Sequence, residues 1–240
     1  MTTGTPITSR PARSVPVPPL QSGDRLDADE FERRYDAAPD LKKAELIDGV
    51  VYVPPPVSDA FHGEPQFRVV GWLALYVITT PGVTGSDNST LRLDRRNRPQ
   101  PDTFLRILPT HGGRAQRDAQ GYVTAGPDLV VEVAASRANY DLNDRLEVYR
   151  RFGVREYVVW RVYDQAVDWF ILRGEHFDTL SPGADGVFRS EFFPGLWLDP
   201  AALIRNDLPQ VAKVLQQGLA TVEHAAFVER LRQAGDAAQP

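Results

Sequence analysis

A short apolar stretch near the middle of the chain carries a single acidic residue. Residues 128–135 read DLVVEVAA, with Gly-Pro directly before them and Ser-Arg directly after. The length, the β-branched residues and these flanks predict a buried central strand rather than a helix. Glu132 lies in the middle of this strand. A buried carboxylate needs a metal, a cation or a hydrogen-bond network, so the sequence predicts a compensating partner for Glu132.

The amino-acid composition limits which kinds of group can compensate the charge of Glu132. The 240 residues are 42% apolar and 25% charged, which is typical of one globular domain with a full core. The chain has no cysteine, which excludes thiolate catalysis, and its four histidines speak against a multi-histidine metal site. A net charge of -5 argues against tight nonspecific binding to duplex DNA, which is itself negatively charged, but is compatible with a local positive groove. No apolar run approaches the roughly 20 residues of a membrane span, and no secretory signal is present, so we expect a cytoplasmic protein.

The order of patterns predicts an α/β fold with a mixed sheet. Residues 1–24 are rich in Pro, Ser, Thr and Arg and predict a disordered tail. Residues 25–198 are expected to form the main domain, and residues 199–240 a helical extension packed on it. Asp48-Gly49 between two apolar runs predicts a hairpin that carries Glu45. The remaining expected elements are a mostly buried helix over 60–79, strands over 90–93, 101–107, 156–162 and 187–193, a hairpin over 166–180, a glycine-rich loop over 109–127 and C-terminal helices over 208–231.

A helix is also expected over residues 142–152, with Asp141 as its N-cap and Gly153 as its terminator. At 100° per residue, Arg145 falls inside the apolar arc of this helix, beside Tyr149 and Phe152. A cation that points toward the core is a candidate partner for Glu132.

Three acids and this cation form a candidate site. Asp102 begins the strand over 101–107, which is expected to neighbour the strand of Glu132. Clustered carboxylates repel one another unless a cation lies between them. One or two carboxylates with water and substrate phosphate suit Mg²⁺, which can activate water and stabilise charge on a phosphodiester.

The order of short motifs strengthens this hypothesis. They are AELIDG around Glu45, SDAFH ending at His62, the Pro-Asp pair at Asp102, GPDLVVEV around Glu132, the D-x3-basic-x3-Y run through Arg145, and GVREYVVW from residue 153. Together they resemble the Uma2-like family of the PD-(D/E)XK restriction-endonuclease-like superfamily over roughly residues 27–180.

This resemblance implies a mixed sheet flanked by helices, with added β-hairpins and C-terminal helices. It implies a Mg²⁺-dependent endonuclease that cleaves DNA, with Mn²⁺ as a substitute. The implied catalytic residues are Glu45, Asp102, Glu132 and Arg145. The implied metal ligands are Asp102, Glu132 and the carbonyl of Val133, while Glu45 is expected to hold a second metal or a water.

The chain departs from the family pattern at three positions. Ala134 stands where the superfamily has a lysine two residues after the strand glutamate, and Arg145 stands where Uma2-like proteins carry a relocated lysine. Ala135 replaces a usual serine. Arginine keeps the positive charge and can hold a phosphate in bidentate fashion, but it cannot act as a base.

Several alternatives remain open. Glu132 and Arg145 can form a purely structural pair, and the chain can be a catalytically lapsed module for binding or assembly. A hydrolase of another phosphoester or of a glycoside is a third option, although no sugar-binding aromatic platform is evident. His62 can contribute to the site, but it is interpreted as a capping or surface residue. The basic turn with Arg95, Arg96 and Arg98 is interpreted as a solvated turn rather than a nucleic-acid contact. A homodimer through edge strands of residues 166–193 is also an expectation.

Overall fold

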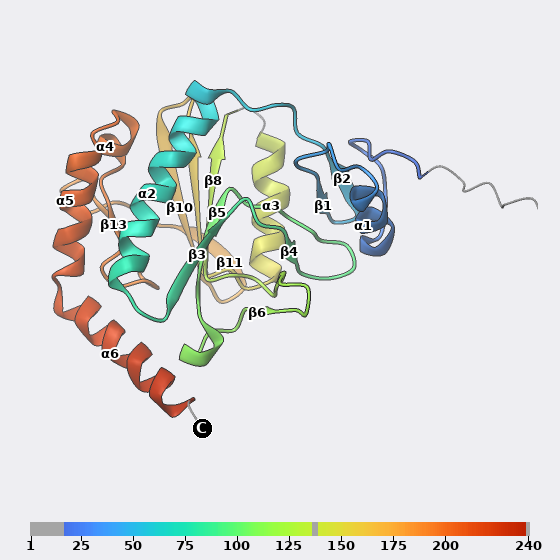
Figure 1. The fold of residues 1–240 in the computed structure, drawn as a ribbon. Helices are drawn as coiled ribbons and strands as arrows, with labels where there is room; N and C mark the ends of the chain where they lie inside the picture. Colours follow the sequence, from blue (N-terminus) through green and yellow to red (C-terminus); the bar gives the residue numbers. More distant parts are fainter. Residues whose placement is uncertain (1–16, 136–138, 239–240) are drawn as a thin grey trace, which may run out of the picture.

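A six-stranded mixed sheet forms the centre of the computed structural model, which describes residues 17–135 and 139–238, without the side chains of 139–143 (Figure 1). The strand order is β11-β10-β9-β8-β5-β3. The bounds are β3 (Val83–Asp87), β5 (Thr103–Ile107), β8 (Leu129–Ala134), β9 (Glu156–Arg161), β10 (Ala166–Arg173) and β11 (His176–Thr179). Strands β8 and β9 are parallel, and the other neighbours in this sheet are antiparallel. The expected mixed sheet is confirmed.

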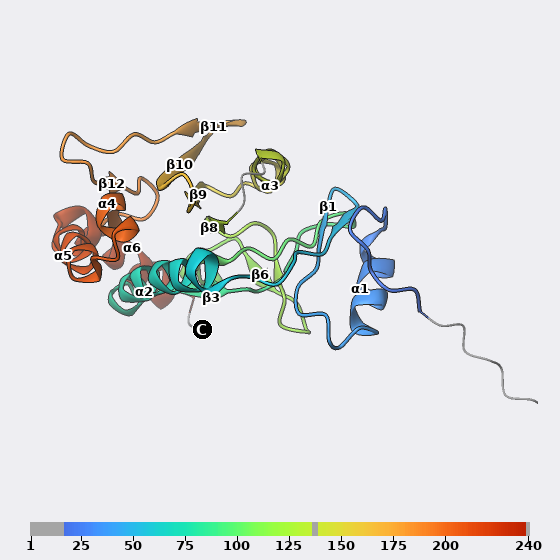
Figure 2. The same cartoon turned by 90° about the horizontal axis from the view of Figure 1, so that it is seen from above.

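Helices cover both faces of this sheet. Helix α2 (Glu64–Thr79) lies on one face and α3 (Asn139–Arg151) on the other, as Figure 2 shows from above. Helix α3 connects the parallel strands β8 and β9, because such strands need a crossover between them. The sheet therefore presents alternate residues of β8 to two separate cores: Val131 and Val133 to the α2 side, Val130 to the α3 side.

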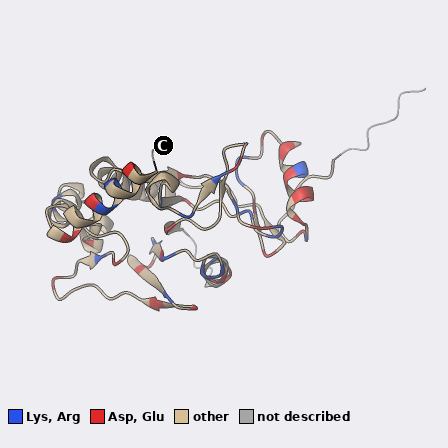
Figure 3. Cartoon of the chain, turned by 90° about the horizontal axis from the view of Figure 1, so that it is seen from below, with Lys and Arg blue, Asp and Glu red and all other residues tan. Residues whose placement is uncertain are grey.

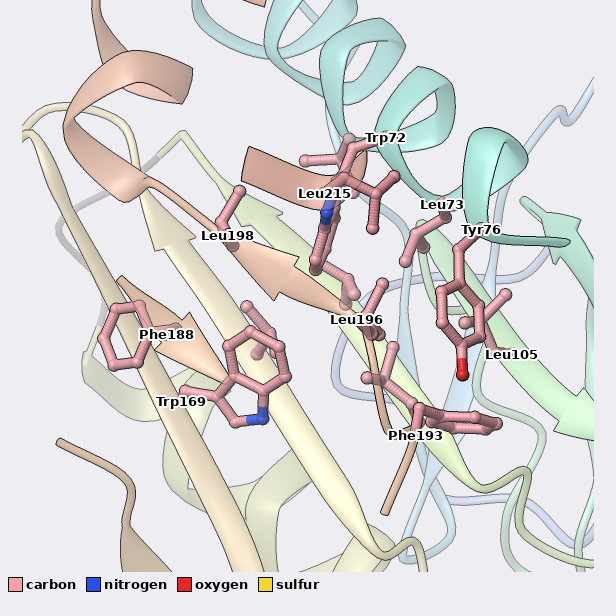
Figure 4. Packing of buried hydrophobic residues seen from close by; sticks show 14 of the residues in the cluster. Trp72, Leu73, Tyr76, Leu105, Trp169, Phe188, Phe193, Leu196, Leu198 and Leu215 are labelled. Carbon is pink, nitrogen blue, oxygen red and sulfur yellow. The ribbon is translucent and has the colours of Figure 1, made fainter. Parts of the chain in front are cut away.

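The core on the α2 side is the larger of the two. Trp72 and Tyr76 of α2 pack there with Trp169 of β10 and with residues of the C-terminal helices, as Figure 4 shows. Trp72 Nε1 donates to the carbonyl of Trp197 at 2.9 Å, and Tyr76 Oη to that of Pro194 at 3.0 Å. The C-terminal helices are α4 (Pro200–Ile204), α5 (Leu208–Leu219) and α6 (Val222–Ala237). They share one core with the sheet.

The N-terminal elements form a smaller layer beside the sheet. Helix α1 (Ala28–Asp36) is capped by Asp27, whose side chain accepts from the backbone N–H of Glu30. Strands β1 (Glu45–Ile47) and β2 (Val50–Tyr52) form the expected hairpin. Its turn has left-handed φ angles of 49° at Asp48 and 78° at Gly49, which suit a two-residue hairpin turn.

Several expected elements are wrong in detail. Residues 109–127 are not a bare loop, since they contain η2 (Pro109–His111), β6 (Gln116–Arg117) and β7 (Val123–Thr124). Strands β6 and β7 form a small sheet with β4 (Leu91–Arg92). The expected edge strand over 187–193 is instead β12 (Phe188–Arg189), which pairs with β13 (Trp197–Leu198) outside the main sheet. Strand β3 was not expected, because VTGSD is polar and contains glycine.

The two helices beside the site also differ from expectation. A π-helical turn, η1 (Asp59–Gly63), precedes α2, and Phe67 and Leu75 are exposed because only one face of α2 packs on the sheet. Helix α3 begins at Asn139, so Asp141 is not its N-cap. The first sixteen residues of the expected tail lie outside the described residues, as does the side chain of Asp141. Within the described ranges, no helix has the length and apolarity needed to cross a bilayer.

Candidate active site

Strands β5 and β8 bring Asp102 and Glu132 together. Their antiparallel register pairs Thr103 with Val131, so Asp102 lies opposite Glu132. The N–H of Val133 donates to Asp102 Oδ2 at 2.8 Å, and the N–H of Asp102 donates to Glu132 Oε2 at 3.3 Å. Both carboxylates are buried. Backbone donors of the neighbouring strand therefore orient each acid.

Glu45 reaches the same place from the β1–β2 hairpin. The side chain is buried, and its Oε1 accepts from the N–H of Gln100 at 2.7 Å. A single bridge between Leu46 and Arg98 holds the hairpin against the segment that leads into β5. Three segments that are far apart in the sequence thus deliver one carboxylate each.

Arg145 of α3 joins two of these carboxylates. Its Nη1 donates to Glu132 Oε1 at 2.8 Å, and its Nη2 donates to Glu45 Oε2. Tyr149, one turn later on α3, donates its hydroxyl to Glu132 Oε1 at 3.1 Å. The expected approach of a guanidinium to Glu132 is therefore present, and it includes Glu45. Oε1 of Glu45 accepts from Gln100 and Oε2 accepts from Arg145, so Glu45 helps to orient the guanidinium.

The electrostatics of the site follow from burial of like charges. Burial raises the pKa of Glu132 to about 7, and Asp102 adds to the effect, while Arg145 opposes it. Burial opposes the charge of Arg145, but Glu45 and Glu132 outweigh it and raise the pKa of the guanidinium well above its ordinary value. Arg145 is therefore a permanent cation in the site.

Two further side chains complete the site: sequence reasoning missed Lys43 and gave His62 a role there only as an alternative. Lys43 places its Nζ 3.1 Å from Asp102 Oδ1. His62 places Nδ1 3.1 Å from the carbonyl oxygen of Val133 and Nε2 3.6 Å from Asp102 Oδ1. The interpretation of His62 as a capping or surface residue is wrong, since Ser58 is the cap of that turn.

A signal for Lys43 was present in the sequence. Residues at positions i and i+2 of an extended segment face the same side. Lys43 therefore shares the side of Glu45, whereas Ala44 faces the N-terminal apolar cluster with Leu46. The signal for His62 is the SDAFH motif that ends at this residue, although its contact depends on the path of η1 over the end of β8.

The donor set is compatible with a divalent cation. The Val133 carbonyl oxygen and Asp102 Oδ1 lie next to the two ring nitrogens of His62, at Nδ1 and Nε2 respectively. With Glu132 they form a set of two carboxylates and one carbonyl, all hard oxygen donors of the kind that Mg²⁺ prefers. No group of three or more His, Cys, Asp or Glu side chains suited to a metal occurs in the described segments. Any metal here would therefore depend on water or substrate for its other ligands.

Neither the basic turn nor the cavity described below contains the predicted site residues. The basic turn makes ion pairs within the protein: Arg95 lies 3.5 Å from Asp27 and Arg98 Nε lies 2.5 Å from Glu32. Acidic and basic residues are interspersed along the ribbon in Figure 3. A cavity of about 300 Å³ lies between α6 and η2, and none of the predicted site residues lines it.

This chain is similar to a family of known proteins and to a solved structure. A family model described as "Uma2: Putative restriction endonuclease" matches residues 28–201, which confirms the resemblance seen in the motifs. A solved structure from Anabaena variabilis, described as a "putative nuclease belonging to DUF820", is similar with a TM-score of 0.49 and 14% identity. The similarity covers 68% of this chain and 92% of that chain. No curated protein matches this chain.

Proposed function

This chain belongs to the Uma2 family, and from that membership we propose that it is a Mg²⁺-dependent endonuclease that hydrolyses phosphodiester bonds of DNA. The observation that carries the proposal is the convergence of Asp102, Glu132 and the Val133 carbonyl beside Arg145 and His62. These oxygens suit a hard divalent cation, and the positive charges of Arg145 and Lys43 suit an anionic substrate.

Asp102, Glu132 and the carbonyl of Val133 would hold the metal ion. When bound, the ion would act as a Lewis acid that activates water and stabilises the charge developing on the phosphate. Arg145 is assigned to orientation: it fixes Glu132 against Glu45 through both Nη atoms and cannot accept a proton.

His62 is the proposed general base. Its Nδ1 faces the carbonyl oxygen of Val133, which only accepts, so the ring proton lies on Nδ1. Nε2 of the neutral ring then carries a free lone pair 3.6 Å from Asp102 Oδ1. A water at this carboxylate is within reach of Nε2, which can take its proton as the water attacks phosphorus.

A second candidate function is a lapsed nuclease that serves as a binding or assembly module. One observation favours it: Asp102 pairs with Lys43, and Glu132 and Glu45 both pair with Arg145. The site is thus internally neutralised to a large extent.

Two measurements separate the candidates. Mn²⁺ binding is measured by calorimetry on the wild type and on Asp102→Asn with Glu132→Gln, which preserve shape and remove charge. Two exposed acids, Asp185→Asn with Glu229→Gln, form the matched control. The nuclease proposal expects binding in the wild type and control and its loss in the site variant.

Cleavage of supercoiled plasmid with Mn²⁺ is then compared for the wild type and Arg145→Lys. Cleavage by the wild type excludes the lapsed module. Cleavage by Arg145→Lys alone supports a lapsed enzyme, and absence of metal binding in the wild type contradicts the nuclease proposal.

A further inference from the structure

We propose that Lys43 is an exchangeable counter-cation of Asp102: its ammonium group neutralises the carboxylate until a divalent cation binds, and then turns to a phosphate oxygen of the nucleic acid. This inference rests on the proposed function. It concerns a residue that the motifs of the sequence do not include.

The position of Lys43 follows from the segment before β1. Its Nζ lies 3.1 Å from Asp102 Oδ1, and the side chain is 23% exposed. Burial opposes the ammonium charge, but Asp102, Glu45 and Glu132 outweigh this and raise the pKa of Lys43. Lys43 is therefore a cation among three carboxylates.

The two oxygens of Asp102 are not equivalent. Oδ2 accepts the N–H of Val133 at 2.8 Å, within the β5–β8 pairing. Oδ1 faces the His62 ring and the Lys43 ammonium. The oxygen best placed to serve a metal is thus the one that Lys43 contacts. Because like charges repel strongly at such distances, a metal and the ammonium cannot both stay on Oδ1.

Lys43 is better suited than Arg145 to leave. The arginine is held by two carboxylates in a planar fork. The lysine carries a compact charge on a flexible four-carbon stem, and its ammonium donates to Asp102. Its side chain is partly exposed and can turn toward solvent. A phosphate oxygen there would replace the lost partner.

The test compares Lys43→Met with Lys42→Met in the full chain. Lys42 is the exposed neighbour and provides the matched control. Calorimetry measures Mn²⁺ affinity without any contribution from catalysis. We expect Lys43→Met to bind Mn²⁺ about tenfold more tightly than the wild type, a gain of about 1.4 kcal/mol, and Lys42→Met to match the wild type.

A second readout concerns the phosphate. Binding of a short fluorescein-labelled duplex with phosphorothioate linkages is measured by anisotropy over a range of salt concentrations. One fewer phosphate contact lowers the slope of log K against log salt by about 1. We expect Lys43→Met to show this smaller slope, relative to the wild type, when Mn²⁺ is present and the wild-type slope when Mn²⁺ is absent. A merely structural lysine would not produce opposite effects on metal and nucleic acid.

Unchanged or weaker Mn²⁺ binding by Lys43→Met, with normal binding by the wild type, overturns the exchange and leaves the proposed function intact. No Mn²⁺ binding by the wild type overturns both. If Lys43→Met fails to fold by circular dichroism, Lys43→Gln replaces it, since glutamine keeps a donor for Asp102 without the charge. The same expectations then apply to that variant.

Discussion

Arg145 shows how one side chain stabilises several buried charges. It links Glu132 of the sheet to Glu45 of the hairpin. Arg145→Met leaves both acids unpaired and is expected to lower the free energy of unfolding by about 3–5 kcal/mol, whereas Arg145→Lys, which loses one bond, costs about 1–3 kcal/mol. Urea denaturation at neutral pH measures both. The control is Arg151→Met, which removes an exposed ion pair between the same helix and Asp48 at an expected cost of about 1 kcal/mol or less. Equal costs for the substitutions at Arg145 and Arg151 would contradict the bridging role of Arg145.

The sequence predicted part of this arrangement. Arg145 stood out because helical periodicity placed a cation in an apolar arc, and Glu132 because an acid interrupted a buried strand. Alternation along the extended segment places Lys43 on the side of Glu45, but the partners of Lys43 and His62 depend on where the segment before β1 and the turn η1 pass over the sheet. The identity of such long-range partners leaves no periodic pattern.

At the scale of elements, the β1–β2 turn positions Glu45. Gly49 has a φ of 78°, and a Cβ there would lie 3.2 Å from the carbonyl oxygen of Leu26 and 3.4 Å from Arg96. Gly49→Ala is expected to cost about 1–2 kcal/mol for the left-handed backbone, plus the cost of these contacts. Gly174→Ala is the control, because its φ is 61° and its Cβ would meet nothing within 4 Å. Urea denaturation should show the larger loss at Gly49, and a smaller loss there would refute this account.

Helix α6 is attached to the end of α2 through His224. Its Nδ1 lies 3.0 Å from the carbonyl of Leu219 and its Nε2 3.0 Å from the Thr80 hydroxyl, so the neutral ring donates to the carbonyl and accepts from the hydroxyl. Burial lowers the pKa of His224 below its ordinary value of 6.5. A depressed folded pKa contributes stability above pH 6.5 that is lost as pH falls through the folded value. Thermal unfolding should therefore occur at lower temperature toward pH 5, with a shallower dependence in His224→Gln; identical profiles would contradict this contribution.

Strong local patterns predicted the elements best. The hairpin over residues 45–52, strands β8 and β9 and the two long C-terminal helices follow turn chemistry or apolar periodicity. Strand β3 and the short strands within residues 109–127 do not, because segments of two to five residues become strands only through pairing. Strand β3 pairs with β5, β7 with β4, and β6 with its neighbour β7. Pairing in the folded chain, rather than propensity, determines these elements.

At the scale of the whole molecule, the C-terminal helices belong to the larger core. Leu215 of α5 is buried in the cluster that also contains Leu105 of β5 (Figure 4). Leu215→Ala is therefore expected to lower the free energy of unfolding by about 2–5 kcal/mol, as Leu105→Ala would. Urea denaturation followed by circular dichroism should show one cooperative transition for both variants. The surface residue Leu208 provides the control, with a small effect expected for Leu208→Ala. A separate early transition in Leu215→Ala would instead show that residues 199–240 unfold independently.

The indole rings lie on one side of the central sheet. Trp72, Trp160 and Trp169 belong to the larger core, and Trp197 lies against Gly218 of α5. The chain has four tryptophans, so its intrinsic emission reports on that layer and not on the one that carries the carboxylates. A tryptophan introduced at Phe177, which packs on the opposite layer, would add a second optical probe and allow the two sides to be followed separately in one sample.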